Sequence, residues 1–168
     1  MIFIGLGANL DSAQFGAPVA TLGAAVKALA SCECRVLRRS SWYRSAPVPP
    51  SDQPWFVNGV VEVSTSLPPH ELLACLHSIE RKFGRVRTEP DAPRVVDLDL
   101  LAYDDLVLGP PLAPVVPHPR LAVRAFVLLP LRELAPDWID PRTGQSIDVL
   151  IENLPAGQEC YRMDDFKG

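Results

Sequence analysis

The most constraining stretch of this sequence is RVVDLDLLAYDDL, residues 94–106, an alternating run that sets two aspartates one residue apart. Alternation predicts a β-strand in which Leu98 and Leu100 point to one face while Asp97 and Asp99 point to the other. Asp is a poor strand residue and like charges on one face repel, so the pattern costs stability unless cations lie opposite. A half-exposed strand with a solvated polar face is the commoner origin of an isolated D-x-D. The residues around this strand indicate whether its aspartates face solvent or face cations.

The remaining hydrophobic pattern predicts an alternation of strands and helices. The predicted elements are a strand at 1–6, a helix at 18–31, strands at 35–45 and 55–65, a helix at 68–84 and then the aspartate strand. This βαββαβ order is that of a split βαβ, or ferredoxin-like, sheet with two helices on one face. The predicted fold class is therefore α+β, a ferredoxin-like βαββαβ core with additional C-terminal short strands and helices.

Two local interpretations complete this prediction. The segment 119–134 is predicted as a helix broken around Pro130, and 146–154 as a small terminal helix. The early GLGANL segment lacks the G-x-G-x-x-G spacing of a dinucleotide site, and its glycines are interpreted as a turn.

Length and composition narrow the class of protein. A chain of 168 residues is expected to form one domain, residues 1–168. A net charge of -4 argues against nucleic acid as a partner, and no apolar run is long enough to span a membrane. The four cysteines lack C-x-x-C spacing, which favours a reducing, cytoplasmic location. The sequence leaves the oligomeric state open, with a monomer as the working expectation.

Three arginines give the aspartates a context. Arg85, Arg87 and Arg94 flank the loop that leads into Asp97 and Asp99, so cations and carboxylates converge at one sheet edge. Arginines alone would be ordinary solvated surface. Arginines facing paired carboxylates suit a phosphate chain held by Mg²⁺, because guanidinium groups bind anions and Mg²⁺ takes carboxylate and phosphate oxygens. The G-x-x-x-x-G-K-[ST] motif is absent, so this is not a P-loop.

Several segments together resemble the 6-hydroxymethyl-7,8-dihydropterin pyrophosphokinase family of folate biosynthesis. They are GANL, YRSAPVPPSDQPWFVNGVV, IERKFGRVR, PRVVDLDLL and VPHPRLAVRAFVLLPLRELAP, in the family's order, over about residues 2–138. The resemblance implies the ferredoxin-like fold and the transfer of pyrophosphate from ATP to 6-hydroxymethyl-7,8-dihydropterin, with AMP as the second product. ATP and the pterin are the expected partners, and two Mg²⁺ ions bound with ATP are the expected cofactor.

The resemblance also implies roles for residues around the phosphates. Asp97 and Asp99 would bind the two Mg²⁺ ions, and Arg85 and Arg94 would complete the catalytic set by gripping the phosphates. The other expected ATP-binding residues are His77, Glu80, Arg87 and His118. For Arg87 a solvated surface charge is an equally good interpretation, and for Glu80 so is the boundary of an amphipathic helix.

For the pterin, the resemblance implies Ser45, Val48, Phe56, Asn58 and Phe126. An amide inside a strand, as at Asn58, is costly unless its donors and acceptor are used, and the amide edge of a pterin would use them. Phe56 and Phe126 would sandwich the flat ring, with core packing as the alternative for each. Ser45 and Val48 would contact the pterin through their main chain.

The chain departs from the family at two places. The loop TEPDAP, residues 88–93, is one residue shorter and lacks an Arg-Trp pair common in the family, which weakens its assignment as a catalytic lid. Pro119 stands where some members have an aromatic hydroxyl. The main alternative is a ferredoxin-like module that binds a nucleotide or pterin without chemistry. A metal-dependent nuclease is disfavoured by the acidic balance.

Overall fold

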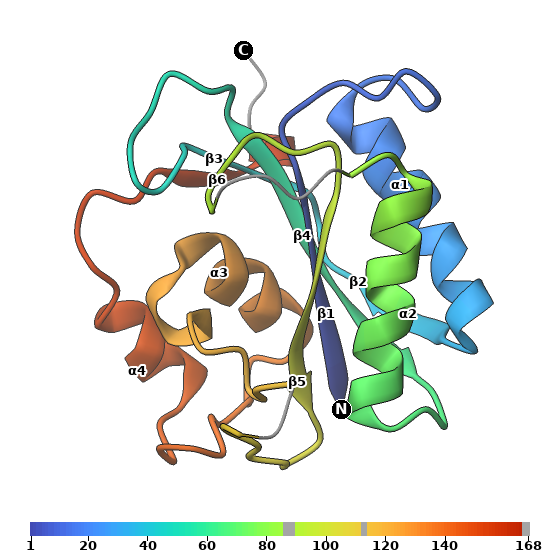
Figure 1. Ribbon diagram of the computed structural model, residues 1–168. Helices are drawn as coiled ribbons and strands as arrows, with labels where there is room; N and C mark the ends of the chain where they lie inside the picture. The colour runs from blue at the N-terminus through green and yellow to red at the C-terminus, as the bar shows by residue number, and fades with distance from the viewer. Residues whose placement is uncertain (86–89, 112–113, 166–168) are drawn as a thin grey trace.

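A six-stranded antiparallel sheet forms the centre of the molecule (Figure 1). The computed structural model describes residues 1–85, 90–111 and 114–165. Strand order is β5-β1-β4-β3-β6, and β2 pairs with β4. The strands are β1 (Ile2–Ala8), β2 (Arg35–Arg39), β3 (Tyr43–Ser45), β4 (Phe56–Ser64), β5 (Asp97–Tyr103) and β6 (Cys160–Arg162).

Helices cover both faces of the sheet. They are α1 (Pro18–Ala28), α2 (Pro69–Lys82), α3 (Ala125–Leu134) and α4 (Ile147–Glu152), with 3-10 turns at Leu29–Cys32, Leu121–Val123 and Met163–Asp165. In Figure 1, α1 and α2 lie on one face and α3 and α4 on the other. The predicted βαββαβ order is confirmed, with the second predicted strand divided into β2 and β3. None of the helices in the described part of the chain has the length and apolarity needed to cross a membrane.

Strand alternation builds two separate cores. On the face under α1 and α2, even-numbered residues of β1 and β5, among them Ile4, Leu6 and Leu98, pack with Leu22 and Leu76 of the helices. On the opposite face, Phe3 of β1, Val60 of β4 and Leu101 of β5 pack against α3 and α4, in a core that includes Leu128 and Leu131. Because side chains of a strand alternate, the three strands β1, β4 and β5 each contribute to both layers.

Three local predictions need correction. The GLGANL glycines do not form a turn, because Gly5 and Gly7 lie inside β1. The helix does not break at Pro130, because α3 continues through it; the break falls at Arg124, whose backbone is extended. A proline inside a helix removes one backbone hydrogen bond, and here the packing of α3 onto the sheet outweighs that loss. Within the described residues the C-terminal part adds one strand, β6, rather than several.

A disulfide joins the first helical segment to α2. Cys32, at the end of the turn after α1, pairs with Cys75 across a sequence separation of 43 residues, with Cα atoms 5.7 Å apart. Sequence reasoning considered only C-x-x-C spacing and missed this long-range pair. Disulfides are rare in reducing compartments, so the pair lends no support to the predicted cytoplasmic location, which stays a prediction.

We predict that the Cys32–Cys75 bond stabilises the fold by up to about 4 kcal/mol, because closing a loop of this length restricts the unfolded chain. Thermal melts of the oxidised parent should fall by several degrees on addition of reductant. The Cys75→Ser variant should melt at the temperature of the reduced parent and should not respond to reductant. A reductant effect that persists in this variant would show that another thiol is responsible.

Candidate active site

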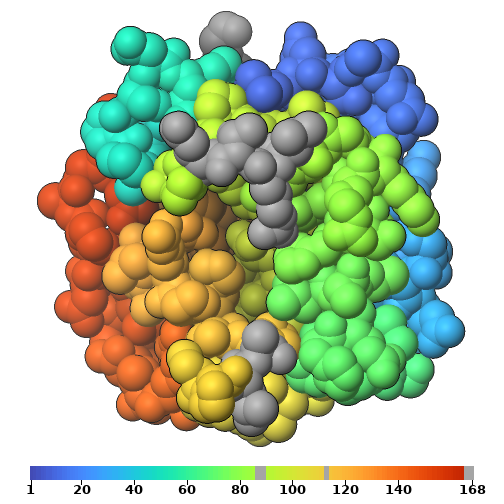
Figure 2. Space-filling view, viewed as in Figure 1, coloured from blue at the N-terminus to red at the C-terminus, as the bar shows by residue number. Residues whose placement is uncertain are grey.

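A pocket opens on the sheet face that carries α3. Figure 2 shows this side of the molecule hollowed between the α3 segment (orange) and the α2 segment (green), with β5 at the base. The pocket encloses about 690 Å³ of empty space, part of it open to solvent. Its walls come from the middle of the sheet, the loop before β4, the segment before β5 and the start of α3. This lining combines apolar side chains with a few polar and charged groups, which is typical of a site for a small organic ligand.

Two glycines of the central strand form the floor of this pocket. Gly7 is paired with Asn58 of β4 on one side and with Asp97 of β5 on the other. Gly5 lies in the same way between Val60 and Asp99. A Cβ atom at Gly7 would come within 3.1 Å of the Asn58 side-chain oxygen. The floor is therefore bare backbone, and it separates an amide on one side from two carboxylates on the other.

Asp97 is held by two arginines. Arg94 Nη1 donates to Asp97 Oδ2 at 2.6 Å, and Arg85 Nη1 donates to Asp97 Oδ1. Arg85 also donates to Glu80 Oε2 at 2.6 Å. Burial alone would lower the pKa of Arg85, but the carboxylates of Asp97 and Glu80 outweigh burial and raise it. This cluster confirms that arginines face the carboxylates, as the sequence predicted.

Glu80 connects α2 to the aspartate strand. Its side chain is buried, and Oε1 accepts the backbone N–H of Leu98 at 3.0 Å while Oε2 accepts from Arg85. A second hollow is lined by His77, Glu80, Arg81 and Arg85. Glu80 is therefore more than the boundary of an amphipathic helix, because it fixes the arginine that links the two hollows.

Asp99 has weaker partners than Asp97, although more of its side chain is accessible, 32% against 18%. Partial loss of solvent around the carboxylate, together with the negative charge of Asp97, raises the pKa of Asp99 to about 7. His118 places Nε2 4.0 Å from Asp99 Oδ1, and His118 Nδ1 accepts the backbone N–H of Arg120 at 3.1 Å. Burial and the positive charge of Arg124 lower the pKa of His118 to about 4. His118 is therefore neutral near pH 7, with its Nε2–H facing Asp99.

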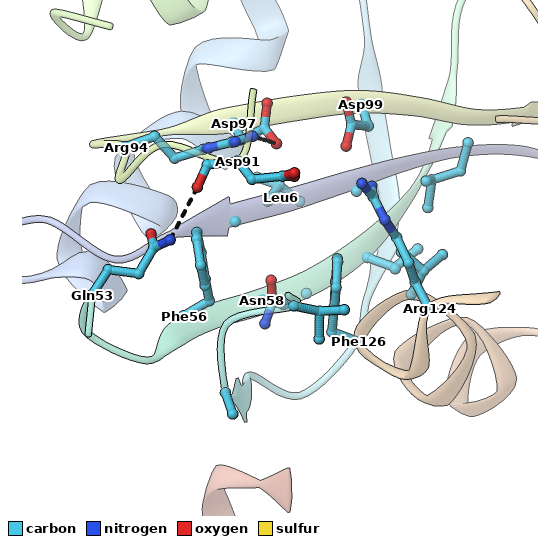
Figure 3. A pocket seen from close by; sticks show the side chains of 18 residues that line it. Leu6, Gln53, Phe56, Asn58, Asp91, Arg94, Asp97, Asp99, Arg124 and Phe126 are labelled. Carbon is cyan, nitrogen blue, oxygen red and sulfur yellow. Dashed lines mark hydrogen bonds and ion pairs between the residues drawn. The ribbon is translucent and has the colours of Figure 1, made fainter. Parts of the chain in front are cut away.

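Arg124 is a site residue that sequence reasoning missed. It immediately precedes α3, lines the pocket and extends its guanidinium toward Asp99 (Figure 3). The same guanidinium lies 5.3 Å from the centre of the Phe126 ring. Burial lowers the pKa of Arg124, and the charge of Asp99 opposes that effect. An arginine two residues before the predicted aromatic was the signal available in the sequence.

The aromatic side of the pocket agrees with the predicted ring site. Phe56 and Phe126 stand on either side of Asn58 in Figure 3. Asn58 is 4% exposed and donates from Nδ2 to Ser45 Oγ at 2.7 Å. Ser45 thus lies behind the amide rather than in the pocket wall, whereas Val48 lines the pocket.

A second network that the sequence did not predict ties three loops together at the rim. Asn9 Nδ2 donates to Gln53 Oε1 at 2.9 Å, and Gln53 Nε2 donates to the Asp91 carbonyl at 3.0 Å. Asn9 also accepts the backbone N–H of Arg94 through Oδ1 at 2.9 Å. The loop before β4 and the segment before β5 are consequently fixed to each other through the end of β1.

Most predicted site residues therefore meet in one region. Those that line the main pocket are Val48, Phe56, Asn58, Arg94, Asp97, Asp99 and Phe126. His77, Glu80 and Arg85 line the second hollow, and Ser45 and His118 contact or face pocket residues. Arg87 and the first part of the shortened loop lie outside the described residues. The individual roles of all these residues stay predictions.

The donor set fits a magnesium ion bound together with phosphate. Asp97 and Asp99 offer hard carboxylate oxygens on the same face of β5. Within the described residues, no three or more His, Cys, Asp or Glu side chains group into a protein-only metal site. Mg²⁺ is typically held by one or two carboxylates, with phosphate and water oxygens completing its shell. Asp97 and Asp99 could hold the metal only in that shared way.

Comparison with known proteins gives one consistent result. A sequence model of the 7,8-dihydro-6-hydroxymethylpterin-pyrophosphokinase family matches residues 3–136. A Synechocystis protein named 2-amino-4-hydroxy-6-hydroxymethyldihydropteridine pyrophosphokinase is 45% identical over 90% of this chain and 74% of its own. A protein of the same name from Methylorubrum extorquens is 43% identical over 94% of this chain and 96% of its own length. Another from Pseudomonas aeruginosa is 42% identical over 92% of this chain and 91% of its own length.

We predict opposite stability effects at the two aspartates in metal-free buffer at pH 8. Asp99→Asn should raise the melting temperature, because it removes a partly desolvated negative charge that the neighbouring charge of Asp97 repels. Asp97→Asn should lower stability by about 1–3 kcal/mol, because Arg85 and Arg94 lose a charged partner. Thermal melts of both variants and the parent measure the two shifts.

The control for this prediction is the pH dependence of the change in melting temperature caused by Asp99→Asn. The raised pKa means that the native state keeps a proton on Asp99 at pH values where the unfolded chain has lost it. The cost of ionising Asp99 is therefore absent well below the unfolded pKa of 3.8, grows as the pH rises and is complete above pH 7, so the gain should be larger at pH 8 than at pH 5. Shifts in the same direction for both variants would contradict this account of the two carboxylates.

Proposed function

This chain belongs to the 7,8-dihydro-6-hydroxymethylpterin-pyrophosphokinase family, and we propose that the pocket between the sheet and α3 is its active site. The chain transfers the pyrophosphoryl group of ATP to 6-hydroxymethyl-7,8-dihydropterin in folate synthesis, giving the pterin diphosphate and AMP. A binding module without chemistry is not favoured, because Arg85, Arg94, Asp97 and Asp99 are all present and clustered.

The pterin occupies the aromatic side of the pocket in this proposal. Its ring lies between Phe56 and Phe126, and its amide edge pairs with Asn58. Ser45 supports this orientation, because it accepts one amide hydrogen of Asn58 and leaves the rest of the amide for the ligand. The main chain near Val48 closes the same side. The hydroxymethyl group then points across the glycine floor toward Asp99 and Arg124.

The triphosphate occupies the charged side. Arg85 and Arg94 bind phosphate oxygens, and His118 offers its Nε2–H beside Asp99. The rest of the nucleotide extends toward His77 and Glu80 in the second hollow. Arg87 belongs to this set by family resemblance alone. Arg124, between the aromatic and acidic sides, is placed to neutralise charge where the two substrates meet.

Magnesium supplies charge neutralisation of the triphosphate when bound, and Asp97 and Asp99 are the residues that would hold it. The number of two ions comes from the family resemblance. A divalent cation is consistent with the site because Arg85 and Arg94 already pair with Glu80 and Asp97, so much of their positive charge is compensated by the protein.

Transfer follows from this arrangement. The hydroxymethyl oxygen forms a bond to the β-phosphorus, the bond between that phosphorus and the oxygen bridging to the α-phosphate breaks, and the hydroxyl proton is released. Reactions of this kind leave the protein mainly to position the reactants and to neutralise charge. The observation that carries the proposal is the presence of the Phe56, Asn58 and Phe126 slot and the arginine–aspartate cluster in one pocket.

We propose that residues 1–168 act as one domain. The family match ends at residue 136, but α4 packs into the same core as α3, and β6 pairs with β3 in the central sheet. The C-terminal part therefore completes the layer that forms one wall of the pocket. A monomer in the cytoplasm stays the working expectation.

We predict that AMP forms in step with pterin diphosphate when the protein is incubated with Mg²⁺, ATP and 6-hydroxymethyl-7,8-dihydropterin. Chromatography of the nucleotides and pterins measures both products, and omission of Mg²⁺ should abolish them. ADP as the main nucleotide product would overturn the assignment. Tight binding of both substrates without turnover would favour the binding module.

We predict that Gly7→Ala raises the KM for the pterin roughly fivefold or more and changes the KM for ATP less than twofold. The added methyl group would crowd the Asn58 oxygen at 3.1 Å and raise the floor on the pterin side. Gly23→Ala on α1 is the matched control, because a Cβ there meets nothing within 4 Å. Equal effects on both substrates would show that Gly7 matters for the fold rather than for the pterin side of the floor.

A further inference from the structure

A turn beyond α3 carries a buried ion pair that the proposed chemistry does not use. Ile139 and Ser146 form an isolated β-bridge, and the Asp140 backbone N–H donates to the Gln145 carbonyl at 2.9 Å. Gly144, with φ +71, closes the turn in a backbone conformation that favours glycine. The turn directs Asp140 inward, where its side chain is 0% exposed.

Arg142 neutralises Asp140 through a fixed fork. Asp140 Oδ1 accepts from Arg142 Nε at 3.1 Å and from the Arg142 backbone N–H at 2.9 Å, while Oδ2 accepts from Nη2 at 2.8 Å. A paired fork of this kind fixes the plane of the guanidinium as well as its position. The remaining terminal nitrogen, Nη1, is thereby aimed in one direction.

That direction is the loop that carries His118. Arg142 Nη1 donates to the His118 carbonyl at 3.2 Å and lies 3.5 Å from the Pro117 carbonyl. The same loop is anchored on its other side by the His118 backbone N–H, which donates to the Leu101 carbonyl of β5 at 2.8 Å. His118 is therefore held between the sheet and the guanidinium of Arg142.

We propose that Arg142, locked by Asp140, is a positioning residue that holds the His118 imidazole beside Asp99. This inference rests on the proposed function in one respect, the role of His118 in binding the triphosphate. Arg142 itself contacts backbone carbonyls, so it acts through His118 and not on the substrate.

Plain stabilisation is the rival explanation for the pair. Buried ion pairs give little net stability compared with apolar side chains of similar volume, because both charges must be desolvated. Stabilisation alone does not require Arg142 to donate to the carbonyl of His118, a residue of the proposed site. The two explanations differ in what happens to His118 when Arg142 is changed.

The experiment compares Arg142→Gln with the parent by NMR of the histidine side chains and by calorimetric titration with MgATP. The chain has three histidines, so His118→Ala identifies the His118 resonance. In Arg142→Gln this resonance should shift while the other two stay in place, and the Kd for MgATP should rise roughly five- to tenfold. Arg142→Lys should recover part of the loss, since an ammonium can still reach one carbonyl. Arg132→Gln is the matched control, because Arg132 forms an exposed pair with Asp148.

Combining Arg142→Gln with His118→Ala separates positioning from stability. With His118 absent, Arg142→Gln should change the Kd for MgATP less than twofold, because the two residues act through one contact. An unmoved His118 resonance, or the same rise in Kd in both backgrounds, would overturn the inference. Failure of the parent to make AMP would count against the proposed function alone, since neither NMR nor calorimetry needs turnover.

Discussion

The structure depends on the double-sided burial of its central strand. β1 is buried along its whole length, with Ile4 and Leu6 in the core under α1 and α2 while Gly5 and Gly7 face the pocket. The register of β1 with its neighbours decides where every floor residue lies. A slip of one residue would turn the carboxylates of β5 into the apolar core and its leucines into the pocket. This register would lose the burial of Leu98, which is 1% exposed, and is therefore strongly disfavoured. The hydrophobic core and the site are thus fixed by the same hydrogen-bonded ladder.

This arrangement explains why a strand can tolerate two aspartates. Asp97 and Asp99 lie on a face where the adjacent strand has no side chains, so open space rather than apolar packing is next to them. Asp97 is compensated by two arginines, whereas loss of solvent and the negative charge of Asp97 raise the pKa of Asp99 to about 7 against the opposing charge of Arg124. Functional sites commonly contain groups that lower the free energy of unfolding, and the rest of the fold must compensate for that loss. Here the two cores on either side of the sheet supply that stability.

Periodicity was enough to predict the elements of the core and the faces of the aspartate strand, because both depend on local alternation. What it could not predict depends on contacts between distant segments. The pairing of Cys32 with Cys75 and the contact of Arg142 with the His118 loop both join parts of the chain that no local pattern connects. Gly7 was misread for a related reason: glycine is a usual turn residue, and only its place between Asn58 and β5 shows why a strand needs it. Family resemblance supplied roles for His118 and the phenylalanines, which residue chemistry alone did not.

The arginine–aspartate cluster also bears on how a highly charged nucleotide can enter a partly buried site. Without ligand, both oxygens of Asp97 are occupied by Arg85 and Arg94, so the arginines are compensated before any phosphate arrives. Phosphate oxygens offer the same fork geometry as a carboxylate, so in the proposed binding mode the two arginines would exchange one charged partner for another. The carboxylate oxygens of Asp97 would then be available to a divalent cation bound with the phosphates. Such an exchange would leave no partly buried charge unpaired, and an unpaired buried charge is what makes the loss of one ion-pair partner costly.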